Sequence, residues 1–175
     1  MLATTAIFVG SEAFQPGRFE AGGDSLAVQS AIISKRDKAA AEASKGALPA
    51  LISFDDDRYW TLCNRLYDEA PAAVGKRVVI RGFLYRKAGL PEGTALIGRN
   101  LMWCCSADMG IIGLLALGPA VAGLKPMEWV EASGKLDTIS FDMNGDGKDY
   151  TVPIIALDSL TSADKGSSSS IIFPF

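Results

Sequence analysis

The sequence contains no histidine and only three cysteines among its 175 residues. Without histidine, the Ser-His and Cys-His pairs that activate many nucleophiles cannot form within this chain. A zinc site would also lack its most common nitrogen ligand, which leaves cysteine and carboxylate side chains. Three cysteines are too few for a secreted module built on disulfides, and a domain of this length does not need them. The available chemistry is therefore narrow.

Positive charge, aromatic residues and long apolar runs are also scarce. The chain has 17 Lys and Arg against 20 Asp and Glu, and the net charge of −3 argues against general affinity for nucleic acid. Aromatic residues make up 9%, too few for a base-stacking platform. No run of about 18 apolar residues exists, so no segment should span a membrane unaided. Hydrophobic residues still reach 49%, enough for the core of one domain.

Residues 1–50 differ in kind from the rest of the chain. Residues 25–45 predict a helix rich in Ala, Lys and Glu, followed by the helix-stopping Gly46 and Pro49. The large apolar residues of this helix lie only in its first half, so its second half should form a stalk or linker. We therefore predict that residues 1–50 are an N-terminal helical extension that contributes little to the stability of the domain.

A second helix is predicted from Asp55 to Glu69. Three consecutive aspartates at its start would interact favourably with the helix dipole. Four residues recur at the spacing of one helical face, and they should pack against the core. These residues are Tyr59, Leu62, Cys63 and Leu66.

From Lys76 onward the pattern alternates as expected for strands. Gly82 interrupts the first strand and suits a bend at a barrel corner. Five strands with one long crossover predict a mainly β domain over residues 51–165, a small OB-like Greek-key barrel with one packed helix. The main rival is an irregular β-sandwich, and residues 166–175 would form a C-terminal tail. The predicted strands cover residues 76–86, 94–104, 111–117, 129–141 and 150–160.

Two adjacent cysteines stand at the end of the second predicted strand. Cys104 and Cys105 are followed by Asp108, and a turn there could bring the thiolates and the carboxylate to one soft or borderline cation such as zinc. Free cysteines are often buried, so plain packing is the preferred alternative on residue type alone. Cys63 would be a further ligand, although its helical position favours the core. Arg99 could pair with Asp108 or lie on the solvated face.

Residues 142–147 resemble the first half of a calcium-binding loop. The twelfth position of that motif, where a bidentate glutamate belongs, is Pro153, which has no carboxylate. The segment also contains Asn-Gly and Asp-Gly between two predicted strands, which is typical of a β-hairpin. A hairpin is therefore the preferred interpretation, with weak calcium binding as the alternative.

The chain resembles the C-terminal soluble domain of the YcgQ-like bacterial two-domain membrane proteins, from about Phe54 to its end. The resemblance is carried by Gly75-Lys76, Val79-Ile80-Arg81-Gly82-Phe83-Leu84-Tyr85-Arg86, Gly98-Arg99, Cys104-Cys105-Ser106-Ala107-Asp108, Trp129-Val130, Gly134-Lys135-Leu136 and the apolar end Ile171-Ile172-Phe173-Pro174-Phe175. In that family two transmembrane helices precede the domain, and a permease is a common partner. The present chain departs from the pattern at Asn100, Leu101 and Met109.

The resemblance implies a membrane-associated accessory module linked to metal homeostasis, with zinc as the candidate metal and a permease as the candidate partner. The absence of a predicted span makes the chain a candidate soluble fragment. The residues leave two other hypotheses open. One is a thiol-redox enzyme that uses Cys104 or Cys105, although the chain lacks a Cys-x-x-Cys spacing. The other is a nucleic-acid-binding OB module, which the charge disfavours.

Overall fold

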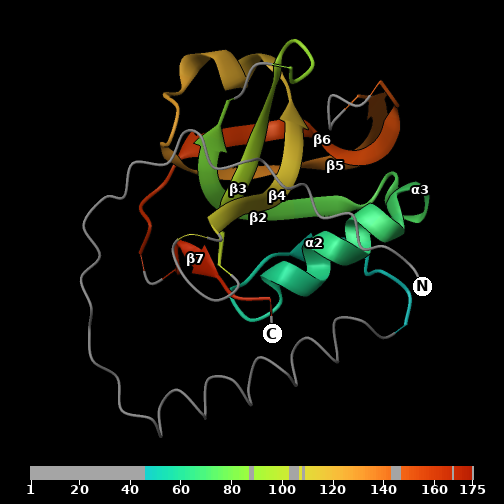
Figure 1. Ribbon diagram of the computed structural model, residues 1–175, viewed down its shortest axis with the longest axis horizontal. Coiled ribbons are helices and arrows are strands. Elements are labelled where there is room, and N and C mark those ends of the chain that lie inside the picture. The colour runs from blue at the N-terminus through green and yellow to red at the C-terminus, as the bar shows by residue number, and fades with distance from the viewer. Residues whose placement is uncertain are drawn as a thin grey trace, which may run out of the picture.

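Five strands form a closed barrel in the computed structural model, which describes residues 46–86, 89–102, 107, 109–142, 147–166 and 168–174. Two short strands and three short helical segments surround this barrel (Figure 1). The elements are β1 (Leu51–Ser53), α2 (Tyr59–Asp68), α3 (Ala70–Ala73), β2 (Arg77–Tyr85), β3 (Thr94–Met102), β4 (Met109–Leu117), the 3₁₀ helix η2 (Pro119–Gly123), β5 (Trp129–Phe141), β6 (Tyr150–Ser162) and β7 (Ile171–Ile172).

The barrel closes in the order β2-β5-β6-β4-β3 and back to β2. Adjacent strands of the barrel are antiparallel, with the exception of β4 and β6. These two run parallel because the chain passes through η2 and β5 between them. This is the five-stranded Greek-key arrangement of an OB-like fold. The predicted fold class is therefore confirmed.

Alternation along the strands puts one set of side chains inside the barrel. In β2 the residues Val78, Ile80 and Leu84 are buried, whereas Arg77 and Arg81 are exposed. Gly82 lies where β2 crosses β3 so closely that a Cβ atom there would stand 2.4 Å from the carbonyl oxygen of Gly98. Glycine therefore permits the tight curvature that the sequence suggested.

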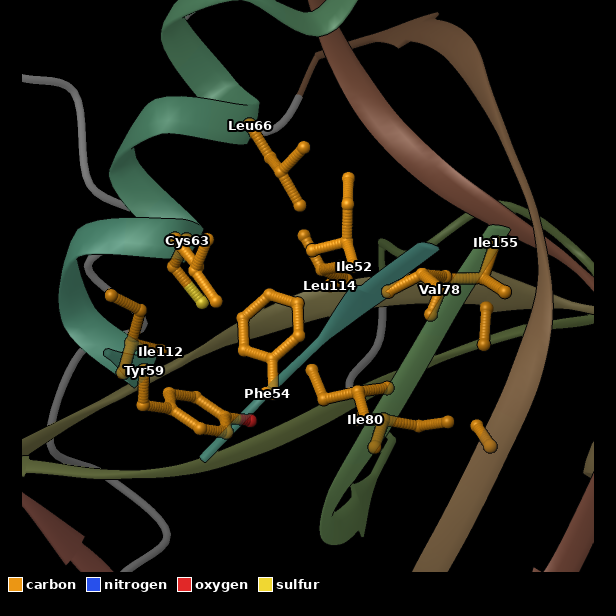
Figure 2. Packing of buried hydrophobic residues seen from close by; sticks show 14 of the residues in the cluster. Ile52, Phe54, Tyr59, Cys63, Leu66, Val78, Ile80, Ile112, Leu114 and Ile155 are labelled. Carbon is orange, nitrogen blue, oxygen red and sulfur yellow. The ribbon is translucent and has the colours of Figure 1, made fainter. Parts of the chain in front are cut away.

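Helix α2 covers the barrel with the predicted face. Tyr59, Leu62, Cys63 and Leu66 are all buried, and Figure 2 shows Cys63 and Leu66 pointing from the helix toward the strand residues of the core. Full burial of each leucine stabilises the fold by about 2 kcal/mol. The short helix α3 begins at Ala70 and carries Pro71 in its first turn, where proline is tolerated.

The start of α2 corrects the prediction, because the helix begins at Tyr59 and not at Asp55. Asp55 instead accepts a hydrogen bond from the backbone N–H of Arg58 at 2.9 Å, and it forms an ion pair with the Arg58 side chain. Asp56 makes contacts outside its own segment. Side chains that bond to the local backbone or to distant groups compete with helix formation, and here that competition delays the helix by one turn.

Two very short strands, β1 and β7, were not predicted. β2 pairs with β3 only near their connecting turn, over Phe83–Tyr85, and the two strands then separate. β1 lies parallel to the first half of β2, and β7 lies parallel to the second half of β3. The two additions therefore line the split between β2 and β3, and the second one places Ile172 in the core.

The predicted hairpin between β5 and β6 is confirmed by an antiparallel ladder that ends with the pair Phe141 and Tyr150. The carboxylate of Asp142 accepts a hydrogen bond from the backbone N–H of Gly147 at 2.9 Å, as turn-forming aspartates often do. Residues 143–146 of the calcium-like segment lie outside the described residues.

Residues 46–50 are attached to the barrel through Leu48, which is 6% exposed and belongs to the core cluster. The Leu48 carbonyl accepts a hydrogen bond from Lys76 Nζ at 2.9 Å. These contacts lie inside the N-terminal extension defined from the sequence, whose boundary at residue 50 stays a prediction.

A pair of N-terminal deletions should locate the boundary of the folded unit. Removing residues 1–45 should shift Tm by less than about 2 °C, because these residues are predicted to form an extension outside the barrel. Removing residues 1–49 also deletes Leu48, whose burial was not predicted from the sequence, so in this case we expect a lower Tm, by several degrees and about 8 °C at most for 1 to 2 kcal/mol. Thermal melts followed by circular dichroism measure both. A large fall already in the shorter deletion would show that the first 45 residues belong to the core.

Candidate functional site: a buried arginine at the split in the barrel

Arg99 is the largest polar side chain in the core. It lies in β3 in phase with Ile97 and Leu101, so its side chain points to the inside of the barrel, and only 1% of it is exposed. It reaches the place where β2 and β3 separate. A buried guanidinium needs hydrogen-bond acceptors and a counter-charge to remain stable.

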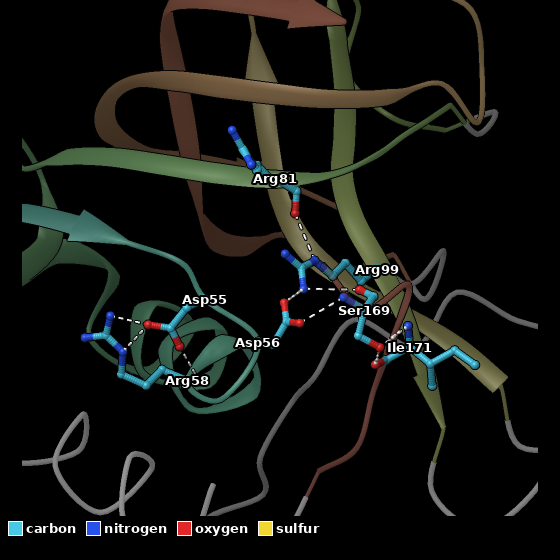
Figure 3. Close-up of polar contacts among 7 residues, drawn as sticks. All are labelled: Asp55, Asp56, Arg58, Arg81, Arg99, Ser169 and Ile171. Carbon is cyan, nitrogen blue, oxygen red and sulfur yellow. Dashed lines mark hydrogen bonds and ion pairs between the residues drawn. The ribbon is translucent and has the colours of Figure 1, made fainter. Parts of the chain in front are cut away.

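Acceptors from three distant segments surround the Arg99 guanidinium (Figure 3). Nε donates to the backbone carbonyl of Arg81 in β2 at 3.0 Å. Nη1 donates to the carboxylate of Asp56, with which it forms an ion pair, and to the backbone carbonyl of Ser169 at 3.2 Å. The second oxygen of Asp56 accepts from the backbone N–H of Ser169 at 2.9 Å. One carboxylate thus joins the loop after β1 to both β3 and the segment before β7.

Two aromatic rings also contact this guanidinium. The Cζ atom of Arg99 lies 4.5 Å from the ring centroid of Tyr59 and 5.5 Å from that of Trp129. Such contacts contribute roughly 2 kcal/mol when they are shielded from water. Asp56, Tyr59, Arg99, Trp129 and Ser169 are called the Arg99 cluster below.

Two buried polar atoms in the Arg99 cluster have no hydrogen-bond partner among the described residues: the hydroxyl of Tyr59 and Nε1 of Trp129. Burial raises the pKa of Tyr59 well above its usual value, with a smaller contribution from nearby Cys63, so this phenol stays neutral. Unpaired buried donors each cost about 1–3 kcal/mol. Both atoms lie on side chains that contact the Arg99 guanidinium.

Arg99 corrects one sequence expectation, because it does not lie on the solvated face. Asp108, the partner that the sequence suggested for Arg99, lies outside the described residues, and among the described residues Asp56 forms the ion pair. Asp56 and Ser169 were not predicted as partners of Arg99 from the sequence. The run of three aspartates at residues 55–57 was the available signal, but it was attributed to the helix dipole.

Cys63 lies in the core, fully buried within the helical face that the sequence predicted. Burial raises the pKa of its thiol far above the usual range, and nearby Arg99 opposes this only in part. A metal ligand must be a thiolate, which this environment disfavours. The packing interpretation is the better supported one for Cys63.

Cys104, Cys105 and Asp108 lie outside the described residues. Their flanks are described: Met102 is the last residue of β3 and pairs with Met109, the first residue of β4. On its other side β3 pairs with β7 through Asn100 and Leu101. Within the described part of the chain, no group of three Cys, Asp or Glu side chains could hold a metal ion.

Barrel topology and the packed helix define this protein as an OB-like β-barrel domain in which a buried arginine pairs with a partly exposed aspartate at the split between the first two barrel strands. The chain belongs to the family of the DUF1980 C-terminal domain, whose model matches residues 31–172. The matched range includes all seven strands and the Arg99 cluster. The finer assignment to YcgQ-like membrane proteins stays a prediction.

Similar solved structures include small single-stranded DNA-binding proteins. The Streptomyces coelicolor protein is 11% identical, with a TM-score of 0.32, and the match covers 51% of this chain and 94% of that one. The mitochondrial protein Rim1 of S. cerevisiae is 9% identical, with a TM-score of 0.31, and the match covers 53% and 98%. These scores are too low to support any functional argument. Comparison with curated proteins finds no match.

No helix in the described ranges combines the length and the hydrophobicity that crossing a membrane requires.

Proposed function

We propose that this domain is a non-enzymatic binding module that takes up a metal ion, with zinc as the candidate, through Cys104, Cys105 and Asp108. We further propose that it serves a membrane permease as an accessory domain, as its resemblance to the YcgQ-like proteins implies. The observation that carries the metal proposal is the register of β3 and β4. Met102 and Met109 pair directly, so two thiols and a carboxylate fall within the six residues that connect two fixed strand ends.

Sulfur and oxygen ligands at this spacing suit zinc or another borderline cation. Fixed strand ends reduce the entropy that a short connection loses when it closes on an ion. The pairing of β7 with β3 holds the strand end from its other side. A metal site so close to paired strands would be supported by the barrel and would not need a separate fold.

Zinc titration of the full chain, purified with a tag that lacks histidine and kept reduced, tests the proposal. Competition with a chromogenic chelator should give one tightly bound zinc per chain, and binding should release protons because thiolates form. Cys104→Ser and Cys105→Ser should each weaken binding more than about 100-fold, and Asp108→Asn about 10- to 100-fold. Cys63→Ala is the matched control and should bind as the wild type does.

Zinc binding that is absent from the wild type, or equal in the Cys104→Ser and Cys105→Ser variants, would contradict the metal proposal. The redox alternative gives a different result in the same preparation. It requires a thiol at residue 104 or 105 that iodoacetamide alkylates well below its ordinary pKa of about 8.5. Cys63 should stay unmodified in the native protein because its thiol is fully buried.

A further inference from the structure

A groove of about 400 Å³ lies on the outer side of the barrel at the split beside β2. Its apolar lining residues are Phe54, which follows β1, and Val79 of β2. Arg81 and Glu131 form one side, Ser53 and Asp55 lie on the other, and Ser168 approaches from the segment before β7. Small-molecule sites commonly have volumes of about 300–1,000 Å³, so the groove has room for a ligand of a few heavy atoms.

Arg99 reaches this groove from the inside of the barrel and is one of its lining residues. Its Nε and Nη1 atoms use the acceptors of the Arg99 cluster. The remaining nitrogen, Nη2, has no acceptor among the described residues, and Figure 3 shows it on the side of the guanidinium that faces away from Asp56. A guanidinium that is 1% exposed and has two unused N–H donors is suited to a carboxylate oxygen, because charge-assisted hydrogen bonds are the stronger ones.

Charges of both signs line the groove. Arg81 pairs with Glu131 across β2 and β5, and both side chains are partly exposed, at 48% and 38%. Asp55, 48% exposed, pairs with Arg58. Asp56 also lines the groove and pairs with Arg99, so every lining charge has a partner and a ligand with a single charge would disturb this balance. A ligand with a carboxylate and an ammonium group a few ångströms apart would meet complementary charges on both sides.

We propose that this groove binds a small zwitterion of the α-amino acid class. The carboxylate accepts hydrogen bonds from Nη2 of Arg99, the ammonium group donates to Asp55 or Glu131, and a small side chain contacts Phe54 and Val79. The inference goes beyond the metal module proposed above and uses none of its three ligand residues. Because the ligand has few heavy atoms, we expect a dissociation constant of about 1 mM.

Titrations of the full chain followed by ¹⁵N NMR test this site. Glycine, alanine and serine are the probes, and acetate and ethylamine each carry only one of the two charges. The amino acids should shift the amide signals of residues 53–56, 79–81 and 131 in a saturable way. Acetate and ethylamine should bind at least about tenfold more weakly, because each loses one charge-assisted contact.

Two variants and one control separate binding in the groove from effects on folding. Arg99→Lys keeps the positive charge but removes Nη2, and Val79→Phe fills the groove from the outer side of β2. Each should weaken glycine binding at least about tenfold. The control, Arg77→Ala, removes an exposed β2 cation that pairs with Asp158 and is not among the groove-lining residues, so it should leave binding unchanged.

Three outcomes would overturn the proposal. The first is no saturable shift with any amino acid. The second is equal glycine affinity in the wild type and in the well-folded Val79→Phe protein. The third is acetate binding as tightly as glycine, which would identify a plain anion site. The Cys104→Ser protein should bind glycine as the wild type does, so this test is independent of the metal proposal.

Discussion

Replacing Arg99 with methionine should destabilise the domain by about 2–3 kcal/mol, less than the loss of about 3–5 kcal/mol for a fully buried ion pair, because the remaining Asp56 is 31% exposed. The variant leaves the carbonyls of Arg81 and Ser169 without this donor and leaves Asp56 without its counter-charge. It also removes the cation that contacts the rings of Tyr59 and Trp129. Methionine is unbranched and of similar length, so lost packing is a small part of the effect.

Arg81→Met is the matched control for this experiment. Arg81 is also an arginine paired with a carboxylate across the barrel, but both partners are partly exposed, at 48% and 38%. Exposed pairs contribute about 0–1 kcal/mol, so the control should change the free energy of unfolding by less than about 1 kcal/mol. Urea unfolding followed by circular dichroism measures both variants. Comparable losses in the two proteins would refute a special role for the buried Arg99 guanidinium.

A double-mutant cycle with Asp56→Asn isolates the ion pair from the other contacts of Arg99. Since Asp56 also accepts the Ser169 N–H, its replacement should destabilise the protein on its own. The two substitutions should fall short of additivity by about 1–3 kcal/mol, as contacting residues in one network do. Additive effects would mean that Arg99 is stabilised mainly by the rings and the backbone carbonyls.

The barrel could be predicted because its strands carry their own signal. β5 runs from Trp129 to Phe141, the range that alternation gave, and β2, β3, β4 and β6 differ from the prediction by at most about two residues. The face of α2 was equally visible from its spacing. Both patterns arise from the burial of one face of a single element, so the order of apolar and polar residues in the sequence is enough to reveal them.

β1 and β7 could not be predicted in the same way. They contain three and two residues, too few for an alternating pattern, and both pair in parallel with strands that are distant in sequence. Their existence depends on the separation of β2 from β3, which is a property of the closed barrel. The apolar end of the chain was noted in the sequence, but not that it pairs with β3.

The sequence indicated Arg99 as a residue of the candidate site but not its partners. Arg99 alternates in phase with Ile97 and Leu101, which already indicated an inward side chain, yet the usual exposure of arginine suggested otherwise. Its partner Asp56 stands 43 residues away, and no local spacing connects the two. Contacts that close a split between strands are tertiary, so they become evident only when the topology is known.

Gly113→Ala should destabilise the barrel by about 3 kcal/mol or more and lower Tm by about 10 °C. Gly113 lies in β4 opposite Gly98 of β3. A Cβ atom there would stand 2.0 Å from the carbonyl oxygen of Ile97 and 2.5 Å from Cα of Gly98. Both neighbours are backbone atoms, so no change of rotamer relieves the overlap and the two strands must move apart. The Gly113 carbonyl also accepts the Tyr67 hydroxyl at 3.1 Å, a bond between the barrel and α2 that such a shift would weaken.

Gly110→Ala in the same strand is the matched control. A Cβ atom at Gly110 would meet nothing within 4 Å, and β4 continues through this position in ordinary strand pairing. Alanine restricts the unfolded chain more than glycine does, so this variant should be neutral or gain about 0.5 kcal/mol. Thermal and urea unfolding of the two proteins side by side measure the difference. Because both substitutions add one methyl group to one strand, equal stabilities would show that the close approach of β3 and β4 does not determine how tightly this barrel closes.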